Sequence, residues 1–96
     1  MNAREKGLIM KLDRRTRELI AIGASVTANC QPCLEYHTGK ALENGASEQD
    51  IMEAIGVGKI IRRGAASKMD TFSQTVVQRA PTLAGVSDRE CGCSSR

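Results

Sequence analysis

The chain has 96 residues, of which 41% are hydrophobic, with one Phe, one Tyr and no Trp. This length suits one small domain, whose core must be built from aliphatic side chains. The net charge is only +3, and no aromatic residues interleave with the basic ones, which argues against nucleic-acid binding. The one basic cluster is expected to be a solvated helix face and comprises Lys59, Arg62, Arg63 and Lys68.

The sequence also contains no pattern that predicts export or membrane insertion. Its longest nearly apolar run, residues 19–28, is about half as long as a membrane span requires. Charged residues near the N-terminus precede only a short apolar patch, unlike a signal peptide. We therefore expect a cytoplasmic protein without a membrane segment. In such a reducing compartment, a Cys-x-x-Cys pair is typically catalytic or metal-binding.

The first expected helix follows a short arm, residues 1–12, whose apolar side chains need a neighbouring helix or subunit to pack against. Asp13 is expected to cap a helix that runs to about residue 28. The apolar stripe of this helix has the spacing i, i+3, i+4, i+7 and consists of Leu19, Ile22, Gly23 and Val26. Glu18 lies at the margin of that stripe rather than on the polar face.

The second expected helix opens with residues 30–37, Cys-Gln-Pro-Cys-Leu-Glu-Tyr-His. Asn29 is expected to cap it, and Pro32 suits a first helical turn because its missing N–H has no helical partner there. Asn44 and Gly45 form an ordinary helix stop. Both cysteines are thus predicted at a helix N-terminus, where free N–H groups and the macrodipole favour thiolate over thiol.

The third expected helix opens at residues 47–50, Ser-Glu-Gln-Asp, a variant of the capping box. Apolar residues then recur in steps of three and four as far as Val76, as one long helix or two helices broken near Gly64. Gly56, Gly58 and Gly64 either mark a kink or let a neighbouring backbone come close. The pattern ends at residues 80–81, Ala-Pro.

No strand-like alternation and no internal repeat occur, so the sequence predicts an all-α protein. We assign residues 1–80 to one helical domain and residues 81–96 to a flexible tail that contains Cys91-Gly92-Cys93. A small helical domain with an aliphatic core often completes that core by self-association.

The chemistry is expected at Cys30, Cys33 and His37, which fall at i, i+3 and i+7 on one helix face. Two thiols three residues apart can close a disulfide, and an imidazole one turn beyond Cys33 can take its proton. We assign Cys33 as the peroxidatic thiol and Cys30 as the resolving thiol. A sulfenic acid on Cys33 would condense with Cys30, and an external dithiol would restore the pair. No cofactor or metal is expected in this cycle.

A carboxylate beside His37 would orient its ring. Glu18 is the leading candidate, because Glu35 points to another face of its own helix. On spacing alone, Glu18 could equally be a solvated carboxylate, and a packed or surface role is the simpler alternative for His37. Tyr36 is expected to be a packing residue that could border the site.

With these residues identified, the chain resembles the AhpD-like core of the carboxymuconolactone decarboxylase family over about residues 12–69. The resemblance lies in residues 14–21, Arg-Arg-Thr-Arg-Glu-Leu-Ile-Ala, and in the motif of residues 30–38. It continues through residues 41–47 and 50–54. A Glu twelve residues before a Cys-x-x-Cys, with a His four residues after it, is specific to the redox-active branch.

The resemblance implies an all-helical fold in which the motif helix packs against the helix that carries Glu18. It implies thiol-dependent reduction of hydroperoxides, as in an alkyl hydroperoxide reductase, with Cys33 peroxidatic, Cys30 resolving, and Glu18 and His37 as the proton relay. The implied partners are a hydroperoxide substrate and a dithiol or a thioredoxin- or lipoyl-type protein reductant. Homotrimers or homohexamers are common in such proteins.

Two departures from the family pattern, and one contrast within the family, qualify these expectations. Pro32 stands where the best-studied branch has a His between the cysteines, which would lower peroxidase efficiency or favour general disulfide exchange. The chain is about half as long as the two-repeat members, so its surface for the reductant would differ. Decarboxylase members lack the cysteine pair, which argues against decarboxylation here.

Two other classes of function stay open at the level of sequence. In the first, Cys91 and Cys93 join Cys30 and Cys33 as four thiolate ligands of a zinc ion. Otherwise, Cys91 and Cys93 belong to an incidental tail or relay electrons to the Cys30–Cys33 disulfide. A non-catalytic oligomer could use the same disulfide as a redox sensor.

Overall fold

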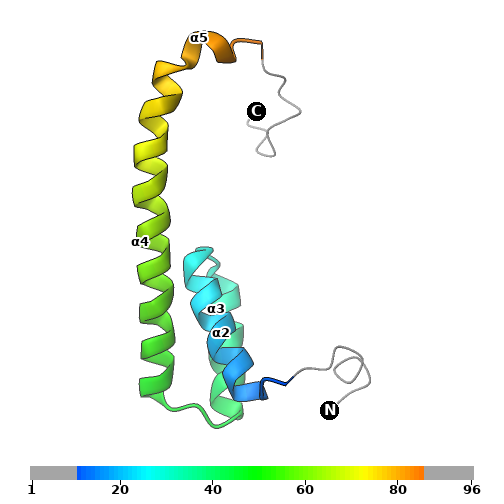
Figure 1. The fold of residues 1–96 in the computed structure, drawn as a ribbon. Helices are drawn as coiled ribbons and strands as arrows, with labels where there is room; N and C mark the ends of the chain where they lie inside the picture. The colour runs from blue at the N-terminus through cyan, green and yellow to red at the C-terminus, as the bar shows by residue number, and fades with distance from the viewer. Residues whose placement is uncertain (1–10, 86–96) are drawn as a thin grey trace. The chain divides into compact units, whose positions relative to one another are not determined.

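The computed structural model describes residues 11–85, and every regular element within that range is a helix (Figure 1). The helices are α2 (Arg14–Thr27), α3 (Gln31–Glu43), α4 (Glu48–Gln78) and α5 (Ala80–Leu83). This confirms the all-α prediction. The chain divides into two compact units, Met1–Ala65 and Ala66–Arg96. The first unit contains α2, α3 and the first part of α4, and it contains all of the predicted site residues.

Helices α2 and α3 form a helical hairpin and pack against each other along their length (Figure 1). As predicted, Asp13 caps α2, because its side chain accepts a hydrogen bond of 2.7 Å from the Thr16 backbone N–H. That N–H bond is the main reason why the pKa of the Asp13 carboxyl lies below its usual value. The stop at Asn44 and Gly45 is also confirmed, since α3 ends at Glu43.

The turn between α2 and α3 differs from its prediction. Cys30, not Asn29, is the N-cap residue of α3, and its side chain makes no capping hydrogen bond. Asn29 instead has a φ of 58°, a left-handed conformation that Asn tolerates better than most residues. The Asn29 side chain accepts a hydrogen bond from Arg62. The need to reverse the chain within three residues therefore outweighs the capping preference of Asn29.

The core of the first unit is small and aliphatic. Ile22 and Ala41 are fully buried, and Ala46 and Ile51 are nearly so. Partly buried Leu19, Leu34, Ala54 and Ile55 pack against them. The predicted stripe of α2 thus faces the core at Leu19, Ile22 and Val26. Full burial of one side chain such as Ile22 contributes roughly 1.5–3 kcal/mol to the stability of the fold. Because the core contains few such residues, each of them accounts for a large part of the stability of the hairpin.

The predicted capping box opens α4. Ser47 Oγ accepts a hydrogen bond from the Asp50 N–H, and Asp50 Oδ2 accepts one from the Ser47 N–H, both at 3.0 Å. Arg15 Nη1 on α2 also lies 3.4 Å from Asp50 Oδ2. The Ser47 backbone bond, and secondarily the Ser47 hydroxyl and Arg15, hold the pKa of the Asp50 carboxyl below its usual value. This carboxylate therefore links the start of α4 to α2.

Helix α4 continues unbroken past Gly64 to Gln78, so the single-helix alternative is correct. Of its glycines, Gly58 permits a close approach. A Cβ at Gly58 would collide with the Gly23 carbonyl oxygen and lie 2.9 Å from the Val26 Cβ. Thr27 Oγ1 also lies 3.1 Å from the Gly58 carbonyl oxygen. At Gly56 and Gly64, a Cβ would meet nothing within 4 Å.

Past Gln78, the chain forms the short helix α5, with Pro81 in its first turn. The part of the predicted tail that the structure describes is therefore helical up to Leu83, whereas Cys91 and Cys93 lie outside the described residues. The predicted domain boundary at residue 80 stays a prediction. Within residues 11–85, no helix combines the length and the apolar composition needed to cross a bilayer.

Candidate functional site

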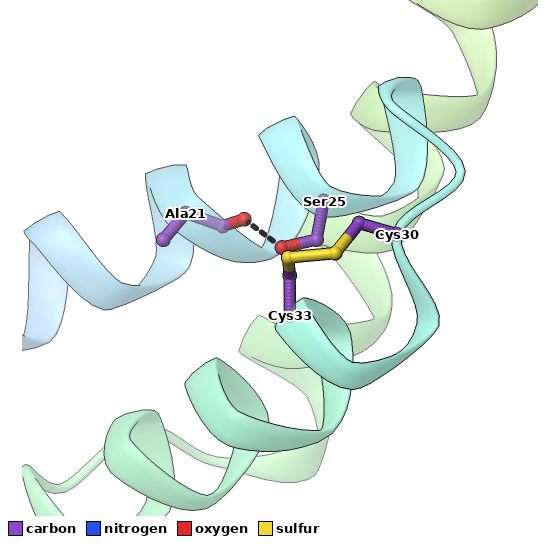
Figure 2. The surroundings of a disulfide bond; sticks show 4 residues. All are labelled: Ala21, Ser25, Cys30 and Cys33. Carbon is purple, nitrogen blue, oxygen red and sulfur yellow. Dashed lines mark hydrogen bonds between the residues drawn. A yellow bond between two sulfur atoms is a disulfide. The ribbon is translucent and has the colours of Figure 1, made fainter.

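The N-terminus of α3 holds the two cysteines. Cys30 is the N-cap residue and Cys33 lies in the first turn. They are joined by a disulfide whose Cα atoms lie 5.3 Å apart (Figure 2), a separation that is ordinary for disulfides. The backbone at the start of α3 thus accommodates the disulfide with an ordinary Cα separation. The Cys30 N–H also donates to the Ser25 carbonyl oxygen at 2.9 Å, which fixes the start of α3 against α2.

The two sulfur-bearing residues have different surroundings. Cys33 is exposed, whereas Cys30 is partly buried. On the α2 side of the disulfide lies Ser25, which is only 5% exposed. Its hydroxyl donates a hydrogen bond of 2.7 Å to the Ala21 carbonyl oxygen (Figure 2). Cys33 thus presents a larger fraction of its surface to solvent than Cys30 does.

The predicted acid and base are in direct contact. His37 Nδ1 on α3 lies 2.6 Å from Glu18 Oε1 on α2, and the side chains are only 30% and 24% exposed. An ionised carboxylate can only accept a hydrogen bond, so Nδ1–H donates. In the neutral ring, Nε2 is then the nitrogen that can accept a proton. Glu18 thus fixes both the orientation and the tautomer of His37.

The alternatives for these residues can now be compared. Glu18, rather than the exposed Glu35, contacts His37. Tyr36 is 59% exposed, so it lies outside the core, and its ring contact agrees with the expectation that it could border the site. Its ring meets the His37 ring edge to face, with centroids 4.9 Å apart and an interplanar angle of 83°. Tyr36 therefore borders the His37 ring from the solvent side.

A cavity of about 240 Å³ lies beside Cys30, and the sequence analysis did not anticipate that residues of α4 help to form it. Its lining combines the end of α2, the start of α3 and residues 55–62 of α4. The lining residues are Ser25, Val26, Asn29, Cys30, Gln31, Leu34, Ile55, Lys59 and Arg62. Lys59 and Arg62 belong to the cluster expected to be a solvated face. No local spacing indicates that they approach Cys30, because 29 residues or more separate them in the chain.

A second cavity, of about 420 Å³, lies between α2 and the first part of α4 and contains none of the predicted site residues. It is lined by Thr16, Leu19, Ile20, Gly23, Ala24, Thr27, Ala54, Val57, Gly58 and Ile61. Ile20, Val57 and Ile61 are each more than half exposed. This surface is apolar and offers almost no polar group to a ligand.

For metal binding, the structure tests only part of the zinc alternative. Among residues 11–85, no cluster of three or more His, Cys, Asp or Glu side chains could hold a metal ion. Cys91 and Cys93, the other two candidate ligands, lie outside that range. The four-thiolate site therefore stays a prediction.

Together, the fold and the site define a small all-helical protein with a cysteine pair that can form a disulfide and a neighbouring carboxylate–imidazole pair. The chain belongs to the carboxymuconolactone decarboxylase family, whose sequence model matches residues 2–73. This confirms the family resemblance seen in the sequence. The family includes AhpD-like members.

One relative is a protein of Paracoccus denitrificans described as "Uncharacterized protein 4 in cox locus". It is 44% identical over 55 residues, which are 57% of this chain and 50% of the relative. The chain thus spans about half the length of that relative, whose description names no activity. No solved structure matches the chain.

Proposed function

We propose that the protein is an AhpD-like thiol peroxidase and disulfide oxidoreductase that reduces hydroperoxides through Cys30 and Cys33. The observation that carries this proposal is the 2.6 Å contact between His37 and Glu18, on the two helices that bracket the disulfide. An ion pair that only stabilised the fold could join any two helices, whereas this one includes a side chain of the helix that begins with Cys-x-x-Cys. In the AhpD-like pattern, this Glu–His pair is the proton relay.

In the reduced protein, His37 takes the proton of the Cys33 thiol through Nε2, while Glu18 holds Nδ1–H. The resulting thiolate attacks one oxygen of the hydroperoxide, so that an S–O bond forms and the O–O bond breaks. The leaving alkoxide takes up a proton and departs as an alcohol. The exposure of Cys33 supports its assignment as the residue that meets the peroxide.

Cys30 then resolves the sulfenic acid on Cys33. Its thiolate attacks the Cys33 sulfur, the S–O bond breaks, and the oxygen departs as water after protonation. The product is the Cys30–Cys33 disulfide, whose Cα separation of 5.3 Å is ordinary for such a bond. Two thiol equivalents from a reductant reopen it, so one hydroperoxide becomes one alcohol and one water per cycle.

The position of both sulfurs at the start of α3 supports their reactivity. The first N–H groups of a helix have no intrahelical acceptor, and the Cys30 side chain makes no capping bond in the disulfide state. In the reduced state, these N–H groups and the helix dipole favour a thiolate there. The start of α3 would therefore activate the thiols and stabilise the leaving thiolate during reduction.

The test is whether peroxide consumption is catalytic. With excess dithiothreitol as electron donor, the peroxidase proposal predicts that many equivalents of cumene hydroperoxide are consumed per protein. The Cys33→Ser variant should consume none above the thiol background. If consumption by the wild type stops after one equivalent per cysteine pair, the redox-sensor alternative is correct instead.

We also propose that copies of the chain assemble, as a homotrimer or homohexamer, over the apolar cavity between α2 and α4. The proposal is supported by Ile20, Val57 and Ile61, which are 55–59% exposed and line one continuous surface. Contiguous apolar surface of this kind usually marks an interaction site. Light scattering should give a multiple of the chain mass for the wild type and a smaller species for Ile61→Asp. A monomeric wild type would contradict the proposal.

A further inference from the structure

The cavity beside Cys30 combines an apolar wall with a cationic rim. Val26, Leu34 and Ile55 supply the apolar wall, and Lys59 and Arg62 supply the positive charges. All of these residues lie in the first compact unit. A reactive sulfur, an apolar wall and two cations around about 240 Å³ match a small molecule that carries an apolar part and an anionic group.

The guanidinium of Arg62 is held in place by the protein. Its Nη1 donates to the Asn29 side-chain oxygen at 3.0 Å and to the Val26 carbonyl oxygen at 3.3 Å. Nε and Nη2 carry further N–H groups that can reach a ligand. Lys59 lies three residues earlier on α4, and residues so spaced share a helix face. In the described part of the chain, no ion pair joins either cation to a carboxylate, so both charges remain available to an anion.

Only one of the two cysteines borders this cavity. Cys30 lines it, whereas Cys33 does not. In the proposed cycle, the hydroperoxide reacts at Cys33. The Cys30 sulfur meets an external molecule only when a reductant opens the disulfide. An occupant of the cavity that reacts with Cys30 is therefore a nucleophile that attacks the disulfide. The nucleophile that does so in thiol–disulfide exchange is a thiol.

From this placement we infer that the cavity binds a small thiol that carries one or more carboxylates and delivers its sulfur to Cys30. This inference rests on the proposed function, because it assigns the reductant of the same disulfide. It narrows the reductant from a general dithiol or a protein to an anionic molecule of low mass. Lys59 and Arg62 bind the carboxylate, and the apolar wall holds the carbon chain.

The reaction is a thiol–disulfide exchange in two steps. The bound thiolate attacks Cys30 Sγ, the bond between Cys30 and Cys33 breaks, and its electron pair leaves on Cys33 Sγ as a thiolate. A second thiol molecule then attacks the outer sulfur of the mixed disulfide and releases Cys30. Overall, two thiols are oxidised to one disulfide and the cysteine pair gains two hydrogens. This order regenerates Cys33, the proposed peroxidatic residue, first.

The experiment measures the reduction rate of the oxidised full-length protein without any peroxide. The probes are 3-mercaptopropionate, 2-mercaptoethanol and cysteamine, which are similar in size but anionic, neutral and cationic. Rates are expressed per thiolate present, to remove differences in thiol acidity. We expect the anionic thiol to react on the order of tenfold faster than the cationic one, because two exposed positive charges attract the first and repel the second. This preference should shrink as salt is added.

Two variants separate the cavity from the overall charge of the protein. Lys59→Glu should abolish the preference for the anionic thiol. Lys68→Glu makes the same change in net charge on α4 at a residue that does not line the cavity, so the preference should remain. Because both residues are exposed, neither change should disturb folding. Equal rates for the three thiols, or equal losses in the two variants, would overturn the inference.

The site of attack can be mapped directly. Reduction by 3-mercaptopropionate is stopped with N-ethylmaleimide and followed by peptide mass mapping. We expect the mercaptopropionate on Cys30 and the maleimide on Cys33, and the reverse arrangement would overturn the inference. Since none of these measurements uses peroxide, a protein that fails the peroxidase assay can still show the preference. Failure of the inference and failure of the proposed function are thus distinguishable.

Discussion

Two stretches of α4 have different surroundings, although both are built from similar residues. In the stretch from Glu48 to Gly58, Ile51 and Gly58 are buried and Ala54 and Ile55 are partly buried. All residues from 59 to 75 are exposed, including Met69 and Phe72, which are 62% and 52% exposed. The first stretch is fixed by contacts with the hairpin. The second stretch keeps such contacts near its start, where Arg62 donates hydrogen bonds to Val26 and Asn29.

This difference indicates which part of the molecule can hold reactive side chains in fixed positions. The proposed proton relay needs side chains that are held in place by their neighbours, and the Glu18–His37 pair lies between the packed helices α2 and α3. The cations Lys59 and Arg62 join the site only because they follow the packed stretch of α4 directly. Beyond them, α4 carries further exposed apolar side chains, such as Met69 and Phe72, which lie outside the surface proposed for self-association.

The largest expected effect on the rate of peroxide reduction comes from a substitution in the hairpin, compared with a similar substitution in the exposed stretch of α4. Glu18→Gln removes the carboxylate that holds His37 Nδ1–H, and the rate of peroxide reduction should fall by about 10²-fold. The comparison is made by initial rates and by the pH profile of those rates, which a merely structural role of Glu18 would not alter. Asp70→Asn removes a carboxylate from the exposed stretch and serves as the matched control. Equal rates for the wild type and Glu18→Gln would contradict the relay.

An intermediate effect is expected at two glycines of α4. Gly58→Ala places a Cβ against the Gly23 carbonyl oxygen and Val26, and such overpacking costs about 1–3 kcal/mol. Gly64→Ala places its Cβ where nothing lies within 4 Å, so the better helix propensity of Ala should stabilise the protein by up to about 1 kcal/mol. Chemical denaturation measures both changes. If both variants lost stability equally, the surroundings of Gly58 and Gly64 would not differ as described, and the contrast between the two stretches of α4 would be wrong.

The smallest expected effect concerns pH. The Ser47 backbone N–H, with Arg15 nearby, lowers the pKa of Asp50 below its ordinary value of 3.8. The carboxylate therefore contributes stability above that ordinary value, and the contribution is lost as the pH falls through the lowered pKa. Asp50→Asn should melt at a lower temperature than the wild type at neutral pH, and the difference should vanish in strong acid. Glu48→Gln, in the same turn, is the control.

Much of this arrangement follows from local sequence. The Asp13 cap, the capping box at Ser47 and the stop at Gly45 depend on neighbouring residues only, and each occurs as predicted. The contact between Glu18 and His37 also occurs, and the motif spacing together with the family resemblance led to it.

Other features depend on contacts that no local pattern records. Asn29 adopts a left-handed turn and binds Arg62, which lies 33 residues further on. Tyr36 is exposed because the α2–α3 interface places His37, rather than Tyr36, toward α2. The cationic rim beside Cys30 arises only when α4 packs against the hairpin.

The most direct measurement is the intact mass of the protein before and after one equivalent of an organic hydroperoxide, for the wild type and Cys33→Ser. Our account predicts that the reduced wild type loses two hydrogens and that peptide mapping finds the Cys30–Cys33 disulfide. Cys33→Ser should give no such product. A wild type that stays fully reduced would contradict the account, because hydroperoxide would then not be its substrate.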